Sequence, residues 1–238
     1  MIKIAAVIPA FNEEDNIADV VDSINAIKSS FFLIHPIVVN DCSSDSTFEV
    51  ITSLDCVALN LPINLGIGGA VQSGFKYAYQ HNYDYVIQVD GDGQHPVKEI
   101  EKMYLELLEV NYDVIIGSRF ILKEGFQSSV MRRFGITYFM WLNSILLGLK
   151  ITDCTSGFRL INSKTLKLFC NYYPDEYPEP EAIVFMKLSG LSIGEIPVQM
   201  NERQGGVSSI SFISSIYYMI KVTLAIFFTF IRIKFKSQ

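Results

Sequence analysis

Two features of the sequence predict an α/β fold built on a mostly parallel sheet. Short apolar runs alternate with amphipathic segments of helical length through about residue 119. The runs are nearly continuous in hydrophobic residues and end abruptly in polar loops, as parallel strands covered on both faces do. Half of the 238 residues are hydrophobic, which suits one large or two small domains with a sizeable core.

The expected elements follow in order from these patterns. Strands are expected at residues 2–8, 34–39, 56–61, 86–89, 113–118 and 191–200. Helices are expected at residues 16–29, 46–54, 70–81, 97–109, 128–149, 163–170, 181–189 and 211–236, with polar loops at 153–159, 172–180 and 201–209. Because open α/β sheets bind ligands beyond the carboxyl ends of their strands, the first half of the chain is expected to form a nucleotide-binding sheet.

Two carboxylates, Asp90 and Asp92, follow the strand at 86–89 and are separated by Gly91. If the glycine turns the chain, both carboxylates converge beyond the strand end, where a cation offsets their repulsion. Hard oxygen ligands favour Mg²⁺ or Mn²⁺, whose remaining ligands are typically water and substrate phosphates. Gln94 offers one more oxygen, and Pro96 suits the first turn of the next helix.

Three other interpretations compete for this motif. It can be an acidic loop whose aspartates serve the turn. A calcium-binding hand is disfavoured because His95 stands where that loop needs glycine, and because a strand precedes it. A phosphatase of the haloacid dehalogenase type also has Asp-x-Asp-Gly after a strand. In that family the motif lies near the N-terminus and Thr stands where this chain has Gln94, whereas here the motif lies far from the N-terminus.

Charge and cysteine usage narrow the class of protein. The net charge of −6 and the pI of about 5.1 argue against nucleic acid as a partner. The four cysteines have no metal-finger spacing, and no signal peptide is recognisable, so we expect reduced thiols in a cytosolic chain.

Polar residues after the other strands are further candidates. Glu13 can meet a ribose or base hydroxyl, or can simply favour a helix N-terminus. For Asp41 we favour ligand contact, such as accepting a nucleobase N–H, whereas Asp45 is expected to cap a helix. The glycines around Gly68 can let backbone approach a flat base or can serve close packing; they match neither the dinucleotide fingerprint nor the phosphate loop of nucleotide hydrolases.

Arginines mark the second half of the chain. Arg119 ends the strand at 113–118, and Arg203 lies in the loop at 201–209. Arg132 and Arg133 stand near the start of a helix, where cations oppose the helix dipole. An anionic ligand or simple solvation explains this pair.

The tail is expected to be an amphipathic helix with a narrow polar stripe formed by Lys221, Ala225, Thr229, Arg232 and Lys236. Insertion across a bilayer is near balance, because Lys221 offsets much of the gain from the apolar residues. A helix lying on an anionic membrane, held by Arg232, Lys234 and Lys236, fits better. The alternative is docking on the protein's own core or on a partner such as a small membrane protein.

Seven segments in order resemble the family 2 glycosyltransferases of the GT-A fold, in the branch with the polyprenyl-phosphate sugar transferases. They are Ile8-Pro-Ala-Phe-Asn-Glu-Glu14, Val39-Asn-Asp-Cys-Ser-Ser-Asp-Ser-Thr47, Asn64-Leu-Gly-Ile-Gly-Gly-Ala70, Asp90-Gly-Asp-Gly-Gln-His-Pro96, Gly117-Ser-Arg119, Ser156-Gly-Phe-Arg159, and the run from Glu195 through Arg203 and Gly206 to Ser208. The resemblance covers about residues 2–210. The chain departs from it at Asn40, where Asp is usual, and at Cys42, where Gly is usual.

The resemblance implies a site and a division of the chain. Residues 1–119 are expected to form the nucleotide-sugar half and 120–210 the acceptor half, with 211–238 as a membrane or interaction helix. It assigns the nucleotide to Pro9, Phe11, Glu13, Asp41, Gly68 and Asp90. It assigns Mg²⁺ or Mn²⁺ to Asp90, Asp92 and Gln94, closure over the diphosphate to Arg203, and an acceptor phosphate to Arg119 with Arg132 or Arg133.

The implied activity is inverting transfer of a sugar from a nucleotide-diphosphate sugar, at the inner face of the cell membrane, in polysaccharide or glycan synthesis. The metal then offsets the charge of the leaving diphosphate. A polyprenyl phosphate acceptor is already ionised and needs no strong base, whereas a sugar hydroxyl needs a carboxylate, for which Glu179 and Glu181 are the candidates. A non-catalytic nucleotide-sugar-binding partner is the alternative outside the enzymes.

Overall fold

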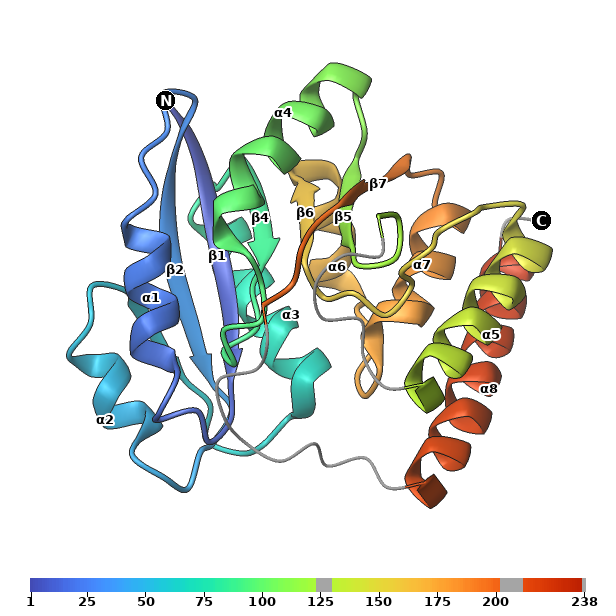
Figure 1. The fold of residues 1–238 in the computed structure, drawn as a ribbon, viewed down its shortest axis with the longest axis horizontal. Coiled ribbons are helices and arrows are strands. Elements are labelled where there is room, and N and C mark those ends of the chain that lie inside the picture. Colours follow the sequence, from blue (N-terminus) through green and yellow to red (C-terminus); the bar gives the residue numbers. More distant parts are fainter. Residues whose placement is uncertain (123–129, 202–211, 237–238) are drawn as a thin grey trace.

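A computed structural model describes residues 1–122, 130–201 and 212–236, and the side chains of these except at 130–132, 212–216 and 236. Seven strands form one sheet in the order β3-β2-β1-β4-β6-β5-β7 (Figure 1). The strands are β1 (Ile2–Ala10), β2 (Phe32–Asn40), β3 (Val57–Asn60), β4 (Tyr85–Gln88), β5 (Val114–Ser118), β6 (Arg159–Asn162) and β7 (Ile193–Pro197). All pairings are parallel except those of β6, which confirms the predicted mostly parallel α/β sheet.

Helices cover both faces of the sheet. They are α1 (Ile17–Asn25), α2 (Thr47–Thr52), α3 (Gly66–Gln80), α4 (Ile100–Val110), α5 (Val130–Leu147), α6 (Ser163–Asn171), α7 (Pro178–Leu188) and α8 (Phe212–Lys236), with a short 3₁₀ turn at Val97–Glu99. One core contains buried residues of α1, α2 and α4, and the other contains buried residues of α3, α5, α6, α7 and α8. The molecule therefore has three layers, with the sheet in the middle.

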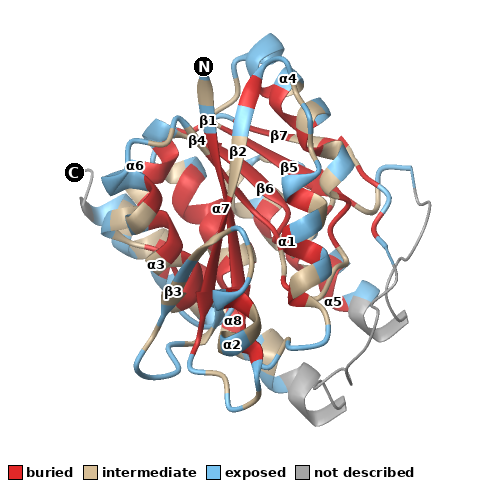
Figure 2. Ribbon diagram, turned by 90° about the vertical axis from the view of Figure 1, so that its left-hand side faces the viewer, coloured by how far each residue is buried: buried red, intermediate tan, exposed pale blue. Residues whose placement is uncertain are grey.

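The strand sequences explain why both layers hold. Along β1, Ile4, Ala6 and Ile8 face the core beneath α1 and α4, whereas Ala5 and Val7 face the core beneath α3. Successive side chains of a strand point to opposite faces, so a strand covered on both sides must be apolar throughout. The central strands are accordingly buried along most of their length (Figure 2).

The structure adds one strand that the sequence pattern misses. Strand β6 pairs antiparallel with both β4 and β5. It has four residues and begins with the charged Arg159, too short and too polar for a clear periodicity signal. Through β6 the sheet continues without a break across the predicted boundary at residue 119.

Several predicted helix bounds also change, and those of α1 and α7 are examples. Helix α1 ends at Asn25 and not near residue 29, and helix α7 begins at Pro178 and not at Glu181. Proline fixes φ at a helical value and lacks the N–H that a first turn leaves unpaired, so it starts a helix readily. The rigid loop predicted at 172–180 is therefore shorter than expected.

Helix α8 docks on α7 and α5, and side chains of its polar stripe contact residues of the rest of the protein. Lys221 pairs with Glu176, Thr229 donates to Glu181 at 2.6 Å, and the guanidinium of Arg232 lies 4.1 Å from the ring centre of Tyr172. Val222 and Ile226 on the same side are buried. Docking on the protein's own core, the alternative to a bare surface helix, is thus the observed packing of one side of α8.

We find no candidate for a membrane-spanning helix among the described residues.

Candidate active site

The carboxyl ends of β1, β2 and β4 surround a cleft of about 430 Å³. Its wall includes Pro9, Phe11, Glu13, Asp41, Gly66, Ile67, Asp90 and Asp92. Parallel register brings these residues together, because β1 pairs with β2 on one side and with β4 on the other. Residues from four separate segments of sequence thus meet at one edge of the sheet, where α/β sheets bind their ligands.

Asp90 and Asp92 both face this cleft, as the spacing predicted. Asp90 follows β4, and its side chain is 38% exposed, so the carboxylate is open to a cation. Gly91 lies tight against the strand beside it, since a Cβ there would be 3.1 Å from the carbonyl oxygen of Pro9. The Oδ1 of Asp92 accepts the amide N–H of Gln94 at 3.1 Å. The turn therefore presents two carboxylates on one side.

His95 holds Asp90 in place, a role that sequence reasoning missed. Its Nδ1 accepts the amide N–H of Asp90 at 2.9 Å, and its Nε2 lies 3.4 Å from Oδ2 of the same residue. An Nδ1 that accepts leaves the ring proton on Nε2, which then faces the carboxylate. The ring is buried against Phe158, so it has little freedom to turn. Gln88 adds a contact of 3.3 Å to Oδ1 of Asp90.

The donor set of this edge suits a divalent ion that a substrate helps to hold. Within the described part of the chain, no cluster of three or more His, Cys, Asp or Glu side chains is placed to bind a metal. Two carboxylates on one cleft are instead what Mg²⁺-type sites offer when substrate phosphates complete the coordination. Gln94, the third predicted ligand, lines a separate small cavity together with Asp90.

Asp41 closes the far side of the cleft and is almost fully buried. Its Oδ1 accepts the amide N–H of Leu65 at 2.7 Å. Its neighbour Cys42 adopts a φ of +59°, the left-handed region in which glycine is unstrained. Asn40 donates to Oδ1 of Asn60 at 2.7 Å, so this departure from the usual Asp is satisfied by a neighbouring strand.

Two predicted nucleotide contacts differ in their surroundings. Phe11 is half exposed on the wall of the cleft, whereas Gly68 is buried against another segment. A Cβ on Gly68 would be 2.1 Å from the carbonyl oxygens of Pro174 and Asp175, and its N–H donates to Asp175 at 2.9 Å. The close backbone approach that Gly68 permits is therefore with 174–175, while Gly66 and Ile67 reach the cleft.

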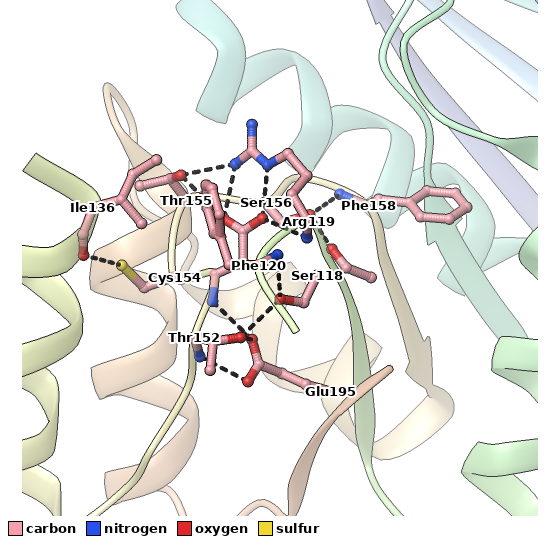
Figure 3. Close-up of polar contacts among 12 residues, drawn as sticks. Ser118, Arg119, Phe120, Ile136, Thr152, Cys154, Thr155, Ser156, Phe158 and Glu195 are labelled. Atoms are coloured by element: carbon pink, nitrogen blue, oxygen red, sulfur yellow. Dashed lines mark hydrogen bonds and ion pairs between the residues drawn. The ribbon is translucent and has the colours of Figure 1, made fainter. Parts of the chain in front are cut away.

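A second cavity of about 40 Å³ adjoins the first, and Asp90 lines both. Arg119 lies on its wall and pairs with Asp153 in a two-pronged contact, Nε to Oδ2 at 2.7 Å and Nη2 to Oδ1 at 2.8 Å. Nη2 also donates to Thr155 at 3.0 Å. These side-chain hydrogen bonds of Arg119 use Nε and Nη2, and in Figure 3 one guanidinium nitrogen has no contact with the other residues drawn. Arg119 thus keeps one donor edge for a ligand.

Glu195 holds the Arg119–Asp153 pair in place through the backbone of the loop that carries Asp153. In Figure 3, Glu195 lies below Thr152 and Cys154, and Arg119 lies above them. Its carboxylate accepts the amide N–H groups of Thr152 at 2.7 Å and of Asp153 at 2.8 Å. Burial raises the pKa of Glu195, because these hydrogen bonds offset only part of the desolvation. For Arg119, burial opposes ionisation, but Asp153 outweighs it and the pKa of the guanidinium is raised.

The remaining predicted residues lie elsewhere. Glu181 accepts hydrogen bonds from Tyr172 at 2.7 Å and from Thr229 at 2.6 Å, and it is absent from the lining of both cavities that contain Asp90. Its carboxylate joins α7 to α8 through Thr229, and its role as a base stays a prediction. The backbone carbonyl of Glu179 accepts from Arg159. Arg133 is exposed at the start of α5; the side chain of Arg132 and all of Arg203 lie outside the described residues.

Comparison with known proteins agrees with this geometry. Residues 5–169 match the model of glycosyl transferase family 2. The chain is 27% identical to the UDP-N-acetylglucosamine–dolichyl-phosphate N-acetylglucosaminyltransferase of Methanococcus voltae, with 81% of this chain and 83% of that protein covered. It is 26% identical to the polyprenol monophosphomannose synthase of Mycolicibacterium smegmatis, with 86% and 80% covered.

Solved structures share the fold. Glucosyl-3-phosphoglycerate synthase of Mycobacterium tuberculosis, solved with Mn²⁺, UDP-glucose and phosphoglyceric acid, superposes with a TM-score of 0.72 at 16% identity, covering 96% of this chain and 79% of that one. TarS of S. aureus, residues 1–349 with UDP-GlcNAc, superposes with a TM-score of 0.61 at 16% identity, covering 93% and 65%. The sheet is thus a GT-A fold, and the chain belongs to glycosyl transferase family 2.

Proposed function

We propose that this glycosyltransferase moves a sugar, with inversion, from a nucleotide-diphosphate sugar to a polyprenyl phosphate. The observation that carries the proposal is the position of Asp90, which lines both the large cleft at the strand ends and the small cavity beside Arg119. A donor in the first and an acceptor at the second meet at this residue. Bond exchange requires such contact between the two substrates.

The donor side fits a nucleoside diphosphate. Pro9, Phe11, Glu13 and Asp41 line the large cleft and do not line the small cavity, so we assign the base and ribose to them and the diphosphate to Asp92. In the proposed assignment Asp90 and Asp92 hold Mg²⁺ or Mn²⁺, with Gln94 as a further oxygen donor. The ion supplies charge neutralisation for the departing diphosphate. Arg203 is proposed to close over the same diphosphate.

The acceptor side fits an anion. The Nη1 edge of Arg119 remains available, and Asp153 fixes the guanidinium plane. Arg133, exposed at the start of α5, and Arg132 beside it in sequence are proposed to add positive charge. A phosphate oxygen is already ionised at neutral pH and attacks without a base. Because Glu181 is bonded to Tyr172 and Thr229, the placement of this carboxylate favours such an acceptor over a sugar hydroxyl.

Relatives support the lipid acceptor. Those with assigned activities include a dolichyl-phosphate N-acetylglucosaminyltransferase and a polyprenol monophosphomannose synthase. We accordingly propose that residues 1–119 bind the donor, that 120–210 bind the acceptor, and that the chain works on the inner face of the cell membrane. The product would serve polysaccharide or glycan synthesis.

A transfer assay tests the proposal. Purified protein is incubated with Mn²⁺, radiolabelled nucleotide-diphosphate sugars and a polyprenyl phosphate in detergent, and the organic phase is counted. The expected result is label in the lipid with at least one donor, and its loss in Asp92→Asn. The matched control is Asp113→Asn. Asp113 lies at the amino end of β5, opposite the strand ends that form the cleft, so this variant should keep activity. Transfer that is unchanged in Asp92→Asn contradicts the assignment of this residue.

A further inference from the structure

The outward sides of α5 and α8 form one apolar surface, which we call the outer face. It consists of Phe134, Trp141 and Ile145 on α5 and of Ile220, Leu224 and Phe228 on α8, each at least 50% exposed. The spacings of seven and four residues on α5, and of four and four on α8, place each set on one side of its helix. Contiguous exposed apolar surface of this kind marks an interaction site.

The two helices present these residues together. Helices α5 and α8 contact each other, and both contact α7. On α5 the buried residues Ile136 and Phe139 point toward the core, and on α8 Val222 and Ile226 do so. Tyr138 and Thr223 join the helices with a 3.1 Å hydrogen bond. Both outward sides are thus turned away from α7, at the edge of the molecule remote from β1 and β2 (Figure 1).

Charge identifies the partner of the outer face. Helices α5 and α8 carry six Lys or Arg residues and no Asp or Glu, whereas the rest of the chain has 13 basic and 25 acidic residues. Arg133 near the start of α5 and Lys234 near the end of α8 are exposed. An anionic bilayer attracts such helices and repels the acidic remainder, which orients the molecule. Long basic side chains also reach a headgroup region while apolar neighbours enter the acyl layer.

The contacts of the polar stripe with the rest of the protein determine which side of α8 is left to face lipid. Lys221, Thr229 and Arg232 are occupied by Glu176, Glu181 and Tyr172. The side of α8 that carries Ile220, Leu224 and Phe228 is therefore the side left to face a membrane. Of the cations predicted to hold this helix, Arg232 and Lys234 are both exposed: Arg232 lies over Tyr172 of the protein, and Lys234 lies 5.2 Å from the ring centre of Phe230 on α8 itself.

We infer that the outer face docks on an anionic lipid bilayer, with α5 and α8 lying in the interface and Trp141 entering the acyl region. The inference rests on the proposed membrane location and deepens it. It adds α5 to the lipid-binding surface, and it leaves one side of α8 packed on the protein while the other side faces lipid. The first turns of α5 and α8 lie at the same edge of the molecule as the carboxyl ends of β1 and β2 (Figure 1). A docked molecule then carries its active-site edge beside the lipid that bears the acceptor.

Trp141 is the single tryptophan of the chain and reports on the outer face directly. The full chain is mixed with vesicles of phosphatidylcholine alone or with phosphatidylglycerol, some carrying brominated acyl chains. The expected result is a blue shift of the emission, and quenching by bromine, with the anionic vesicles. Added salt should weaken binding, because surface charge attraction is screened. Emission that is unchanged while the protein sediments with vesicles overturns the inference.

Variants separate this surface from others. Leu224→Ser and Phe228→Ser should each weaken vesicle partitioning by about fivefold, from the apolar area lost. Leu108→Ser, an equally exposed leucine on α4, is the matched control and should leave partitioning unchanged. Arg133→Gln should weaken it by about fivefold on anionic vesicles only. Equal partitioning of Leu224→Ser, Phe228→Ser and wild type contradicts the inference, as does a vesicle-independent blue shift that grows with protein concentration.

Sugar transfer in detergent, measured separately, keeps the two proposals distinct. Transfer without vesicle binding removes the docking surface and leaves the function. Vesicle binding through Trp141 without transfer to any polyprenyl phosphate removes the function and leaves the surface.

Discussion

Replacing Gly68 by Ala should destabilise the protein, whereas the same change at Gly135 should stabilise it. A Cβ on Gly68 would lie 2.1 Å from the carbonyl oxygens of Pro174 and Asp175, and real Cβ atoms essentially never come closer than 3.0 Å to such atoms. The start of α3 and the backbone at 174–175 must therefore separate by the difference, about 0.9 Å. On Gly135, within α5, a Cβ meets nothing within 4 Å.

The magnitudes follow from these contacts. Overpacking against backbone costs about 1–3 kcal/mol. Losing the 2.9 Å hydrogen bond from Gly68 to Asp175 adds about 1 kcal/mol. The helix preference of alanine offsets about 1 kcal/mol. We expect Gly68→Ala to lower the free energy of unfolding by about 1–3 kcal/mol, and Gly135→Ala to raise it by about 0.5–1 kcal/mol.

Urea denaturation followed by circular dichroism measures both changes, and an unchanged slope m confirms that stability alone has moved. Nucleoside diphosphate affinity is measured in parallel. A Gly68→Ala variant as stable as the wild type refutes the packing role. If that stable variant also fails to bind nucleotide, the predicted contact between Gly68 and the base is the better explanation.

Three further predictions concern the polar groups of the site. Asp153→Asn should lower stability by about 3 kcal/mol, because it leaves the mostly buried Arg119 without its anionic partner; urea denaturation checks this, and wild-type stability would contradict it. His95→Leu should weaken Mn²⁺-dependent nucleotide binding by about tenfold, because it releases Asp90. His95→Asn keeps an acceptor near the Nδ1 position and should restore most of this binding. Calorimetry compares the two variants, and equal affinities would show that the ring only fills space. Because the folded-state pKa of Glu195 is raised above its unfolded value of about 4.3, the folded state binds more protons between the two values, so stability should fall as pH rises through that window. Melting temperatures from about pH 4 to pH 7 should show this slope in the wild type and a flatter one in Glu195→Gln, and parallel profiles would reject it.

The layout of the sheet was predictable because its physical signal is local. The run from Ile4 to Ile8 is apolar at every position, which only a strand covered on both faces requires. Strand β6 was missed for the opposite reason. It begins at Arg159, whose guanidinium donates to the carbonyl oxygens of Ser156, Cys154 and Glu179. These bonds let a charged residue be buried, and hydrophobic periodicity does not reveal them.

The cleft was predictable in part for a similar reason. Asp90 and Asp92 stand beside a glycine directly after a strand, and two acids there indicate a cation. The roles of His95, Asp153 and Glu195 depend on which residue each side chain meets. Asp153 and Glu195 lie 42 residues apart in sequence and meet through one hydrogen bond, which no spacing rule encodes.

The tail shows how one pattern supports two opposite placements. The stripe through Lys221, Thr229 and Arg232 was predicted correctly, but a stripe does not say which side faces water. Acidic and aromatic partners at Glu176, Glu181 and Tyr172 decide it, because they pair with the stripe and leave the apolar residues outside.

The account depends on a divalent ion held jointly by Asp90, Asp92 and a diphosphate. Calorimetric titration with a panel of nucleoside diphosphates, in Mn²⁺ and again in a chelator, tests this claim most directly. We predict that at least one nucleotide binds in Mn²⁺, that the chelator removes most of this binding, and that Asp92→Asn weakens it by about tenfold or more while its melting curve stays that of a folded protein. Binding that is equally tight in the chelator, or in Asp92→Asn, would contradict the account.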